Sequence, residues 1–108
     1  LASGNLGEAF YNDASTADLS FAAARAGPQS AAPFRAKAVL SEANFGRAQK
    51  SAILTLNDRA ISPELQRRMA IAAGCDPILE IASGHSPFLT APTELAHLLV
   101  QSAARKPL

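Results

Sequence analysis

The sequence predicts an α/β fold built on two parallel strands. Two short apolar runs, residues 51–56 and 77–82, have the length of strands and no polar face, which is typical of strands buried on both sides of a parallel sheet. Each run is followed by a segment in which apolar residues recur at helical spacing. The order strand, helix, strand, helix implies a right-handed parallel crossover.

The composition is that of a small globular domain. The chain has 108 residues, of which 48% are hydrophobic and 18% are charged, so disorder over the whole length is not expected. The net charge is +1 and the basic residues are scattered, which gives no electrostatic reason to expect nucleic acid or an anionic membrane as a partner. The single cysteine, Cys75, excludes an internal disulfide, and we expect no cofactor.

We expect the protein to be cytoplasmic and without a membrane segment. No run approaches the roughly 18 to 20 consecutive apolar residues that span a bilayer, and the first residues do not form a basic region followed by an apolar core. The chain begins with Leu1 rather than methionine, in a context that resembles the interior of a polypeptide. A processed or truncated polypeptide is therefore expected.

The first part of the chain predicts one helix after an irregular start. Residues 1–14 combine turn-forming residues with a pair of aromatic side chains, which favours a loop or a short helix that docks an aromatic patch. Ser15 or Thr16 can cap a helix over residues 17–26, which stops at Gly27.

Three short features follow before the first strand. Residues 29–34 predict one further helical turn, which an Ala-Pro pair interrupts. The pair Val39 and Leu40 predicts a short extended segment, and residues 44–47 predict a turn.

Two helices are predicted around the second strand. Ser62 supplies an N-cap, and Pro63 occupies the first position of a helix that ends at Gly74. The apolar stripe of this helix consists of Leu65, Met69, Ala72 and Ala73. A closing helix is predicted over residues 93–104. Its inward-facing side chains are predicted to be Leu95, Leu98, Leu99 and Ala103.

Two strands alone make an incomplete sheet. Both edges of the sheet would be unpaired and much of each apolar face uncovered, whereas parallel sheets occur almost only when both faces are covered. The sequence therefore predicts that this chain is part of a larger sheet.

Two polar side chains follow the predicted strands. Asp58 comes two residues after the first strand, and His85 lies in the small-residue turn Ser83–Phe88 after the second. The carboxyl ends of parallel strands lie at one edge, where ligands bind. A carboxylate that accepts a hydrogen bond from one imidazole nitrogen leaves the other nitrogen to take a proton from a nucleophile. Asp58 and His85 are therefore a candidate proton-handling pair; the alternative is a structural cap and a surface imidazole.

Four stretches resemble the C-terminal part of the α/β-hydrolase superfamily: Leu54–Ile61, Pro63–Met69, Gly84–Leu89 and Pro92–Ala96. Within the superfamily they are most similar to the branch of small bacterial esterases, plant methylesterases and hydroxynitrile lyases. The resemblance implies the last two parallel strands of that fold with their flanking helices, preceded by the end of a helical cap.

The resemblance also divides the chain in two. Residues 1–49 correspond to the end of the cap and a return segment, and residues 50–108 to the C-terminal strands and helices of an incomplete hydrolase core. The missing N-terminal hydrolase portion, in the same gene or in a companion chain, is the expected partner.

Asp58 and His85 match the triad acid and the triad base of this superfamily in motif and in chain order. The nucleophile of the superfamily is a serine in a G-x-S-x-G turn earlier in the chain, and this sequence contains no such motif. Ser86 is a poor candidate because its surrounding residues lack the closing glycine. The resemblance therefore implies a chain that supplies two triad members and is inactive alone.

The implied activity is the hydrolysis of a small carboxylic ester. Hydroxynitrile lyases of this branch have a lysine directly after the triad histidine, and Ser86 stands there in this sequence. A lyase-like enzyme remains an alternative, as does a non-catalytic hydrolase-derived module that binds a complementary chain or a ligand. Phe88, Leu89 and Tyr11 are candidates to line the substrate pocket, although each of them is also a candidate for the apolar core.

No metal site is expected. His97 lies among leucines in the closing helix and is interpreted as a helix-packing or surface residue. Together with His85, Cys75 and Asp76 it contains no pair with the spacing of zinc ligands.

Overall fold

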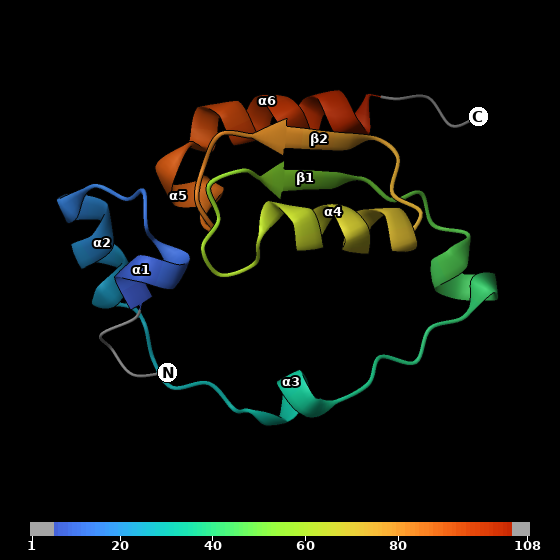
Figure 1. Ribbon diagram of the computed structural model, residues 1–108, viewed down its shortest axis with the longest axis horizontal. Coiled ribbons are helices and arrows are strands. Elements are labelled where there is room, and N and C mark those ends of the chain that lie inside the picture. The colour runs from blue at the N-terminus through green and yellow to red at the C-terminus, as the bar shows by residue number, and fades with distance from the viewer. Residues whose placement is uncertain (1–5, 105–108) are drawn as a thin grey trace.

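The computed structural model describes residues 6–104 and contains a two-stranded parallel sheet. Strand β1 (Ala52–Thr55) pairs with β2 (Ile78–Ile81) in the register Ala52 to Ile78 through Thr55 to Ile81. Both strands point the same way in Figure 1, so their carboxyl ends share one edge. The prediction of two parallel strands is confirmed. The ends of the two regions predicted from the resemblance, residues 1–5 and 105–108, lie outside the described residues.

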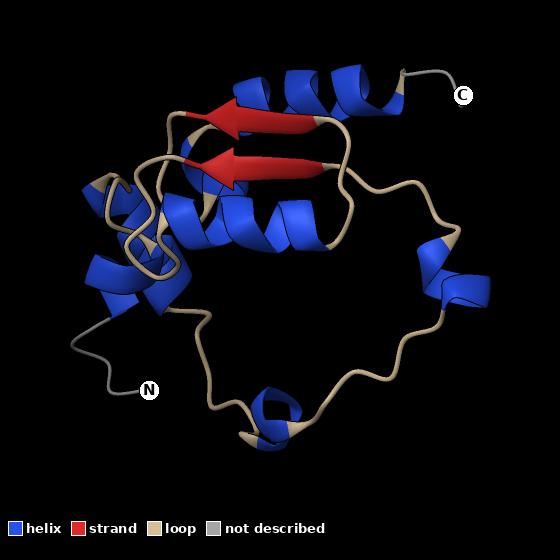
Figure 2. Ribbon diagram, turned by 45° about the vertical axis from the view of Figure 1, so that its right-hand side comes forward, coloured by secondary structure: helices blue, strands red, loops and turns tan. Residues whose placement is uncertain are grey.

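Helix α4 (Pro63–Ala72) connects the two strands and lies along β1 (Figures 1 and 2). The Ser62 hydroxyl accepts a hydrogen bond from the Leu65 N–H at 3.3 Å, and Pro63 occupies the first turn, as predicted. The chain leaves the helix through Gly74, whose φ of +69° lies in the left-handed region that glycine adopts without strain.

Helix α6 (Pro92–Ala103) closes the chain and lies along β2. A single-turn helix, α5 (Pro87–Thr90), precedes it where only a turn was predicted, and it immediately follows the loop that carries His85. Within residues 6–104, no helix combines the length and the apolar character needed to cross a membrane.

Two helices precede the sheet and lie beside its carboxyl edge (Figure 1). The first is α1 (Leu6–Phe10), the short helix that the sequence left open as an alternative to a loop. The second is α2 (Thr16–Ala23), whose N-cap Ser15 accepts a hydrogen bond from the Asp18 N–H at 3.1 Å. It ends before the predicted residue 26 because the main chain tightens into a turn from residue 24 onward.

A long strap leads from α2 to β1 and stands away from the rest of the chain in both views (Figures 1 and 2). Every residue from 23 to 45 is exposed. The strap contains α3 (Ala32–Arg35), close to the predicted helical turn, and a π-helical turn, η2 (Glu42–Gly46), where a simple turn was predicted. The extended segment predicted at residues 39 and 40 forms no strand, since no other strand of the described chain lies beside it.

The core of the described residues is small. Its buried apolar side chains are Ala22, Leu54, Ala70 and Ile81. The prediction that Leu99 and Ala103 face inward is wrong: both are exposed, and Leu65 and Met69 of the predicted α4 stripe are exposed as well. A sheet of two strands is too narrow to cover the whole apolar surface of the helices beside it.

The molecule exposes more surface than a compact protein of its size. Its accessible surface is 8040 Å², whereas a compact monomer of 11.2 kDa exposes about 5,700 Å². Its radius of gyration is 15.8 Å, compared with about 13 Å for a compact domain of this length. The exposed strap and the uncovered faces of the helices contribute to this excess.

Candidate active site

The parallel register brings Asp58 and His85 together at the carboxyl edge of the sheet. Asp58 follows β1, His85 follows β2, and the Nδ1 atom of His85 lies 2.9 Å from Oδ2 of Asp58. The Asp58 side chain is 3% exposed, whereas the His85 side chain is 30% exposed. The carboxylate is therefore shielded from solvent, while the imidazole reaches the surface.

The carboxylate of Asp58 is held by its own loop. Its Oδ1 atom accepts hydrogen bonds from the backbone N–H groups of Ala60 at 2.7 Å and Ile61 at 3.0 Å, which is the side-chain turn that aspartate favours at such positions. Its Oδ2 atom accepts a bond of 2.7 Å from the Thr55 hydroxyl at the end of β1. Both oxygens are thus fixed before His85 is considered.

Hydrogen bonding outweighs burial at this carboxylate. Burial of the side chain raises the pKa of Asp58, because a charged group loses its hydration. The hydrogen bonds from the Ile61 N–H, from Thr55 and from His85, together with the Ala60 N–H, lower the pKa more than burial raises it. The net pKa lies below the ordinary value, so the carboxylate is ionised at neutral pH.

An ionised carboxylate accepts hydrogen bonds and does not donate them, so the proton between the two side chains belongs to Nδ1 of His85. In the neutral imidazole the other nitrogen, Nε2, then carries the free electron pair. This arrangement can take a proton from a hydroxyl group and later return it.

The loop that carries His85 is attached to the segment after α1. The backbone N–H of Gly84 donates to Oδ2 of Asp13 at 2.6 Å, and the hydroxyl of Ser86 donates to the Phe10 carbonyl at 2.7 Å. The ring of Phe10 also meets the His85 imidazole edge-on, with centroids 5.1 Å apart and planes at 64°. The imidazole is therefore oriented by Asp58 on one nitrogen and by Phe10 on its ring.

The same early segment reaches the Asp58 loop. The side-chain amide of Asn12 donates to the Asn57 carbonyl at 2.9 Å, and the Asn57 N–H donates to the Ser83 carbonyl at 2.9 Å. An exposed ion pair of 2.7 Å between Arg59 and Glu8 adds a weaker connection. The two loops and the first segment thus form one hydrogen-bonded unit.

The predicted pocket residues lie around this unit with different exposures. Phe88 is 66% exposed, and Leu89 is half-buried in α5. Tyr11 is also half-buried, but the aromatic ring that contacts His85 is that of its neighbour Phe10. Ser86 is 3% exposed and its hydroxyl is engaged with the main chain, so it is held away from the role of nucleophile.

The sequence placed Phe10 only in an aromatic patch of the first segment, and it indicated no role for Asp13 or Gln66. Phe10, Asp13 and Gln66 contact the His85 ring, the His85 loop and the Asp58 carboxylate, respectively. Phe10 and Asp13 are far from His85 in the sequence, and no spacing pattern connects them. Gln66 lies in the first turn of α4, the helix that follows the Asp58 loop, which is the signal that could have indicated its contact with that loop.

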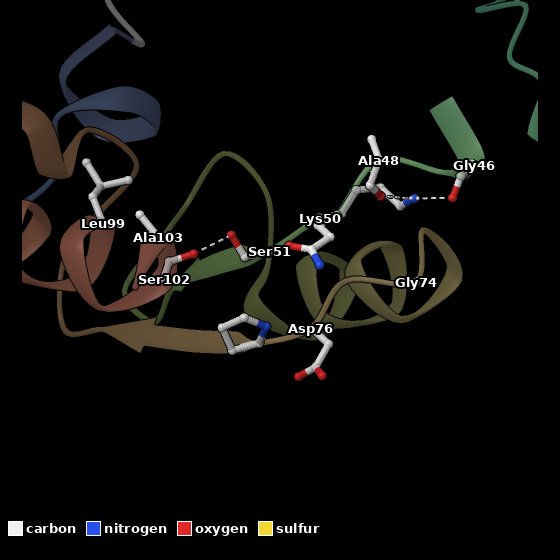
Figure 3. A pocket seen from close by; sticks show the side chains of 11 residues that line it. Gly46, Ala48, Lys50, Ser51, Gly74, Asp76, Leu99, Ser102 and Ala103 are labelled. Carbon is white, nitrogen blue, oxygen red and sulfur yellow. Dashed lines mark hydrogen bonds between the residues drawn. The ribbon is translucent and has the colours of Figure 1, made fainter. Parts of the chain in front are cut away.

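A hollow of about 820 Å³ lies at the opposite edge of the sheet (Figure 3). Ser51 and Pro77, which precede the two strands, contribute to its wall. The Lys50 ammonium there donates to the carbonyl oxygens of Phe45, Gly46 and Ala48 at 3.2, 3.4 and 3.0 Å, so its hydrogen-bonding capacity is used within the strap. Among residues 6–104, no three metal-ligating side chains gather into a candidate metal site.

Comparisons with known proteins identify esterases as relatives. No protein-family model matches the chain. Two proteins of Arabidopsis thaliana, named as candidate chloroplastic methylesterases 14 and 11, are 26% identical over 95 residues and 29% identical over 103 residues. These matches cover 87% and 94% of this chain but 27% and 26% of the relatives. The chain thus spans about a quarter of the length of these curated relatives.

The solved structures show the same relation. The crystal structure of polyneuridine aldehyde esterase superposes with a TM-score of 0.86 at 21% identity, covering 95% of this chain and 42% of that protein. A mutant of the same esterase gives a TM-score of 0.82 at 22% identity. The fold of this chain is therefore that of a part of this esterase.

Replacing Gly84 tests how closely Asn12 and Asp13 pack against the His85 loop. A Cβ atom at Gly84 would overlap Asn12 Oδ1 and Asp13 Oδ1, and hydrogen bonds to the Asn57 carbonyl and from the Gly84 N–H hold these two side chains in place. Gly84→Ala should therefore lower the free energy of unfolding by about 1–3 kcal/mol. Gly27→Ala is the matched control, since no atom lies within 4 Å of its added Cβ. Urea denaturation measures both variants, and an equal effect of the two would contradict the tight contact.

The lowered pKa of Asp58 predicts a pH-dependent contribution to stability. A carboxyl group whose pKa is lowered on folding stabilises the folded protein. This stabilisation is fully present above the ordinary pKa of about 3.9, and it is lost as the pH falls through the pKa of the folded state. Wild type should therefore exceed Asp58→Asn in unfolding free energy near neutral pH, and the difference should shrink as the pH drops below about 4. Denaturant titrations across this range measure it; a difference independent of pH would contradict the assignment.

Proposed function

Because the chain has the fold of the C-terminal portion of an α/β-hydrolase, we propose that it supplies the acid, Asp58, and the base, His85, of a serine carboxylic ester hydrolase. The observation that carries this proposal is the 2.9 Å bond between His85 Nδ1 and the shielded Asp58 carboxylate. The names of the relatives, which are methylesterases and an esterase, support the class of reaction.

In the proposed reaction, Nε2 of His85 takes the proton of a serine hydroxyl as the serine oxygen attacks the ester carbonyl. The tetrahedral intermediate then collapses: the bond to the alcohol oxygen breaks, and His85 returns the proton to the departing alcohol. A water molecule, deprotonated by the same nitrogen, then attacks the acyl-serine. As the second intermediate collapses, the bond to the serine oxygen breaks, the carboxylic acid leaves, and His85 returns the proton to the serine oxygen. Throughout, the Asp58 carboxylate stabilises the imidazolium that forms.

The serine must come from outside these residues. The sequence contains no G-x-S-x-G motif, and the chain corresponds to about a quarter of the length of its methylesterase relatives. We place the nucleophile and the oxyanion-hole donors in an N-terminal hydrolase portion, in the same polypeptide or in a companion chain. The 108 residues alone are accordingly proposed to be inactive.

The exposed apolar side chains of the chain support the proposal of an N-terminal hydrolase portion that packs against it. Large apolar side chains are exposed along the strap, where Phe34 is 76% and Val39 is 97% exposed, and on α4 and α6. Exposed apolar patches of this kind mark contact surfaces. We propose that the N-terminal hydrolase portion covers them, with residues 1–49 contributing to a cap and residues 50–108 completing the core.

Two features bear on the substrate. Ser86, which follows His85, has its hydroxyl bound to the Phe10 carbonyl, and a serine at this position favours ester hydrolysis over the lyase-like alternative. Phe88, Leu89 and Tyr11 stay candidate pocket residues, and the exposed ring of Phe88 is available to an uncharged acyl or alcohol group. A small carboxylic ester is the proposed substrate class.

The test is covalent labelling of the complete protein, comprising this chain and the N-terminal portion, with a fluorophosphonate that reacts with activated serines. His85→Ala should slow labelling by about 10²- to 10⁴-fold, because the serine loses its base. His97→Ala is the matched control, since His97 is exposed on α6, and it should label at the wild-type rate.

Equal labelling of the His85→Ala variant and wild type would contradict the role of His85. A complete protein that does not label at all, and whose upstream sequence holds a residue other than serine in the nucleophile position, would instead identify the chain as a non-catalytic binding or complementation module.

A further inference from the structure

We propose that Gln66 is a positioning residue, which holds the Asp58 carboxylate in the orientation that meets His85. The kinetic consequence of this role rests on the proposed hydrolase function, whereas its structural consequence does not. Gln66 lies in the second half of the first turn of α4 and is half-buried. Its side chain points back toward the loop between β1 and the helix, where Asp58 lies.

The Gln66 amide makes contacts with the whole Asp58 loop. Its Nε2 atom lies 2.7 Å from the Ile61 carbonyl oxygen, 3.2 Å from the Thr55 carbonyl oxygen and 3.2 Å from Asp58 Oδ2. The amide nitrogen has two hydrogens, so one is donated to the nearest acceptor, Ile61, and the other is shared between the Thr55 carbonyl and Asp58 Oδ2. Its Oε1 atom accepts a hydrogen bond from the Thr55 N–H at 2.9 Å. One side chain thus ties the end of β1, the carboxylate and the far side of the loop together.

The contact with Thr55 resembles the pairing between strands. The N–H groups of Ala52 and Leu56 donate to the Pro77 and Ile81 carbonyls on the β2 side. Because these groups alternate in direction along a strand, the Thr55 N–H and carbonyl face the other edge of β1. There the Gln66 amide oxygen accepts from the Thr55 N–H, and the amide nitrogen donates to the Thr55 carbonyl. Gln66 therefore fixes the main chain at the residue whose hydroxyl also binds Asp58.

The bond to Oδ2 gives this side chain a role beyond holding the loop. Oδ2 is the oxygen that accepts the bond from His85 Nδ1 at 2.9 Å and from the Thr55 hydroxyl at 2.7 Å. The Thr55 hydroxyl has one hydrogen, and its shorter contact with the anionic Asp58 than with Gln66 Oε1 at 3.2 Å assigns that hydrogen to Asp58. Gln66 leaves the hydroxyl free for this by accepting from the Thr55 N–H instead.

The backbone of α4 keeps Gln66 in place independently of Asp58. Its N–H donates to the Ser62 carbonyl at 3.0 Å, and the Ser62 hydroxyl caps the helix at Leu65. The capped first turn of α4 thus fixes the position from which the Gln66 amide reaches the loop. Without the amide, Asp58 keeps the bonds from Ala60 and Ile61 to Oδ1 but loses one donor and the fixed position of Thr55 at Oδ2.

The experiment compares Gln66→Met with Gln101→Met in the complete protein. Methionine keeps the length and helix preference of glutamine but removes all of its hydrogen bonds. Gln101 is exposed on α6 and is the matched control. Two measurements are made on each variant: the downfield proton resonance of the His85 Nδ1–H, and kcat and KM for 4-nitrophenyl acetate.

The proposal predicts that Gln66→Met loses or strongly weakens the Nδ1–H resonance and lowers kcat by roughly tenfold or more, with KM within about twofold of wild type. Gln101→Met should leave all three quantities unchanged. A Gln66→Met protein with the wild-type resonance and wild-type kcat overturns the proposal. A rise in KM alone also overturns it, because a positioning residue acts on the base and not on the substrate.

Two further outcomes are distinguished. If the complete protein has no esterase activity but Gln66→Met loses the resonance, the proposed hydrolase function fails while the positioning role stands. If Gln66→Met does not fold, Gln66→Glu replaces it, because it keeps the size and an acceptor for the Thr55 N–H but removes the donor to Asp58. The loss of the resonance in folded Gln66→Glu supports the proposal, and its retention, or the unfolding of both variants, rejects it.

Discussion

The site depends on the parallel pairing of β1 with β2. The register that places Thr55 opposite Ile81 sets the ends of the two strands side by side, so that loops separated by a helix and a strand can share one hydrogen bond. A shift of one residue would turn every side chain of the shifted strand to the other face. The bond between Asp58 and His85 is therefore a consequence of the sheet, and the surrounding loops refine a position that the strands have already established.

Local patterns in the sequence were sufficient for the strands, for the helix that begins after Ser62, and for the two polar residues at the strand ends. They were not sufficient for the contacts of Phe10 and Asp13 with the His85 loop, because these join residues far apart in the sequence and follow no spacing rule. The inward orientation predicted for Leu99 failed for a related reason: amphipathic spacing identifies an apolar face but not which neighbour covers it.

The Asp58 carboxylate is enclosed by hydrogen-bond donors, whereas the His85 imidazole is partly open to solvent. The Asp58 carboxylate is shielded and saturated with donors, which stabilises its charge at neutral pH, whereas His85 presents part of its ring to the surface. The same contrast holds for the whole chain, whose loops at the carboxyl edge are tightly connected while its strap and helix faces are exposed. Both features agree with the proposal that the nucleophile lies in an N-terminal hydrolase portion.

The role proposed for the pair requires that Asp58 fixes the tautomer of His85 and leaves Nε2 ready to accept a proton. Nitrogen-15 NMR of the imidazole tests this most directly, because protonated and unprotonated ring nitrogens have well-separated chemical shifts. With His85 neutral, we expect a protonated Nδ1 and an unprotonated Nε2. A neutral ring protonated at Nε2, or one that exchanges evenly between the two tautomers, would contradict it.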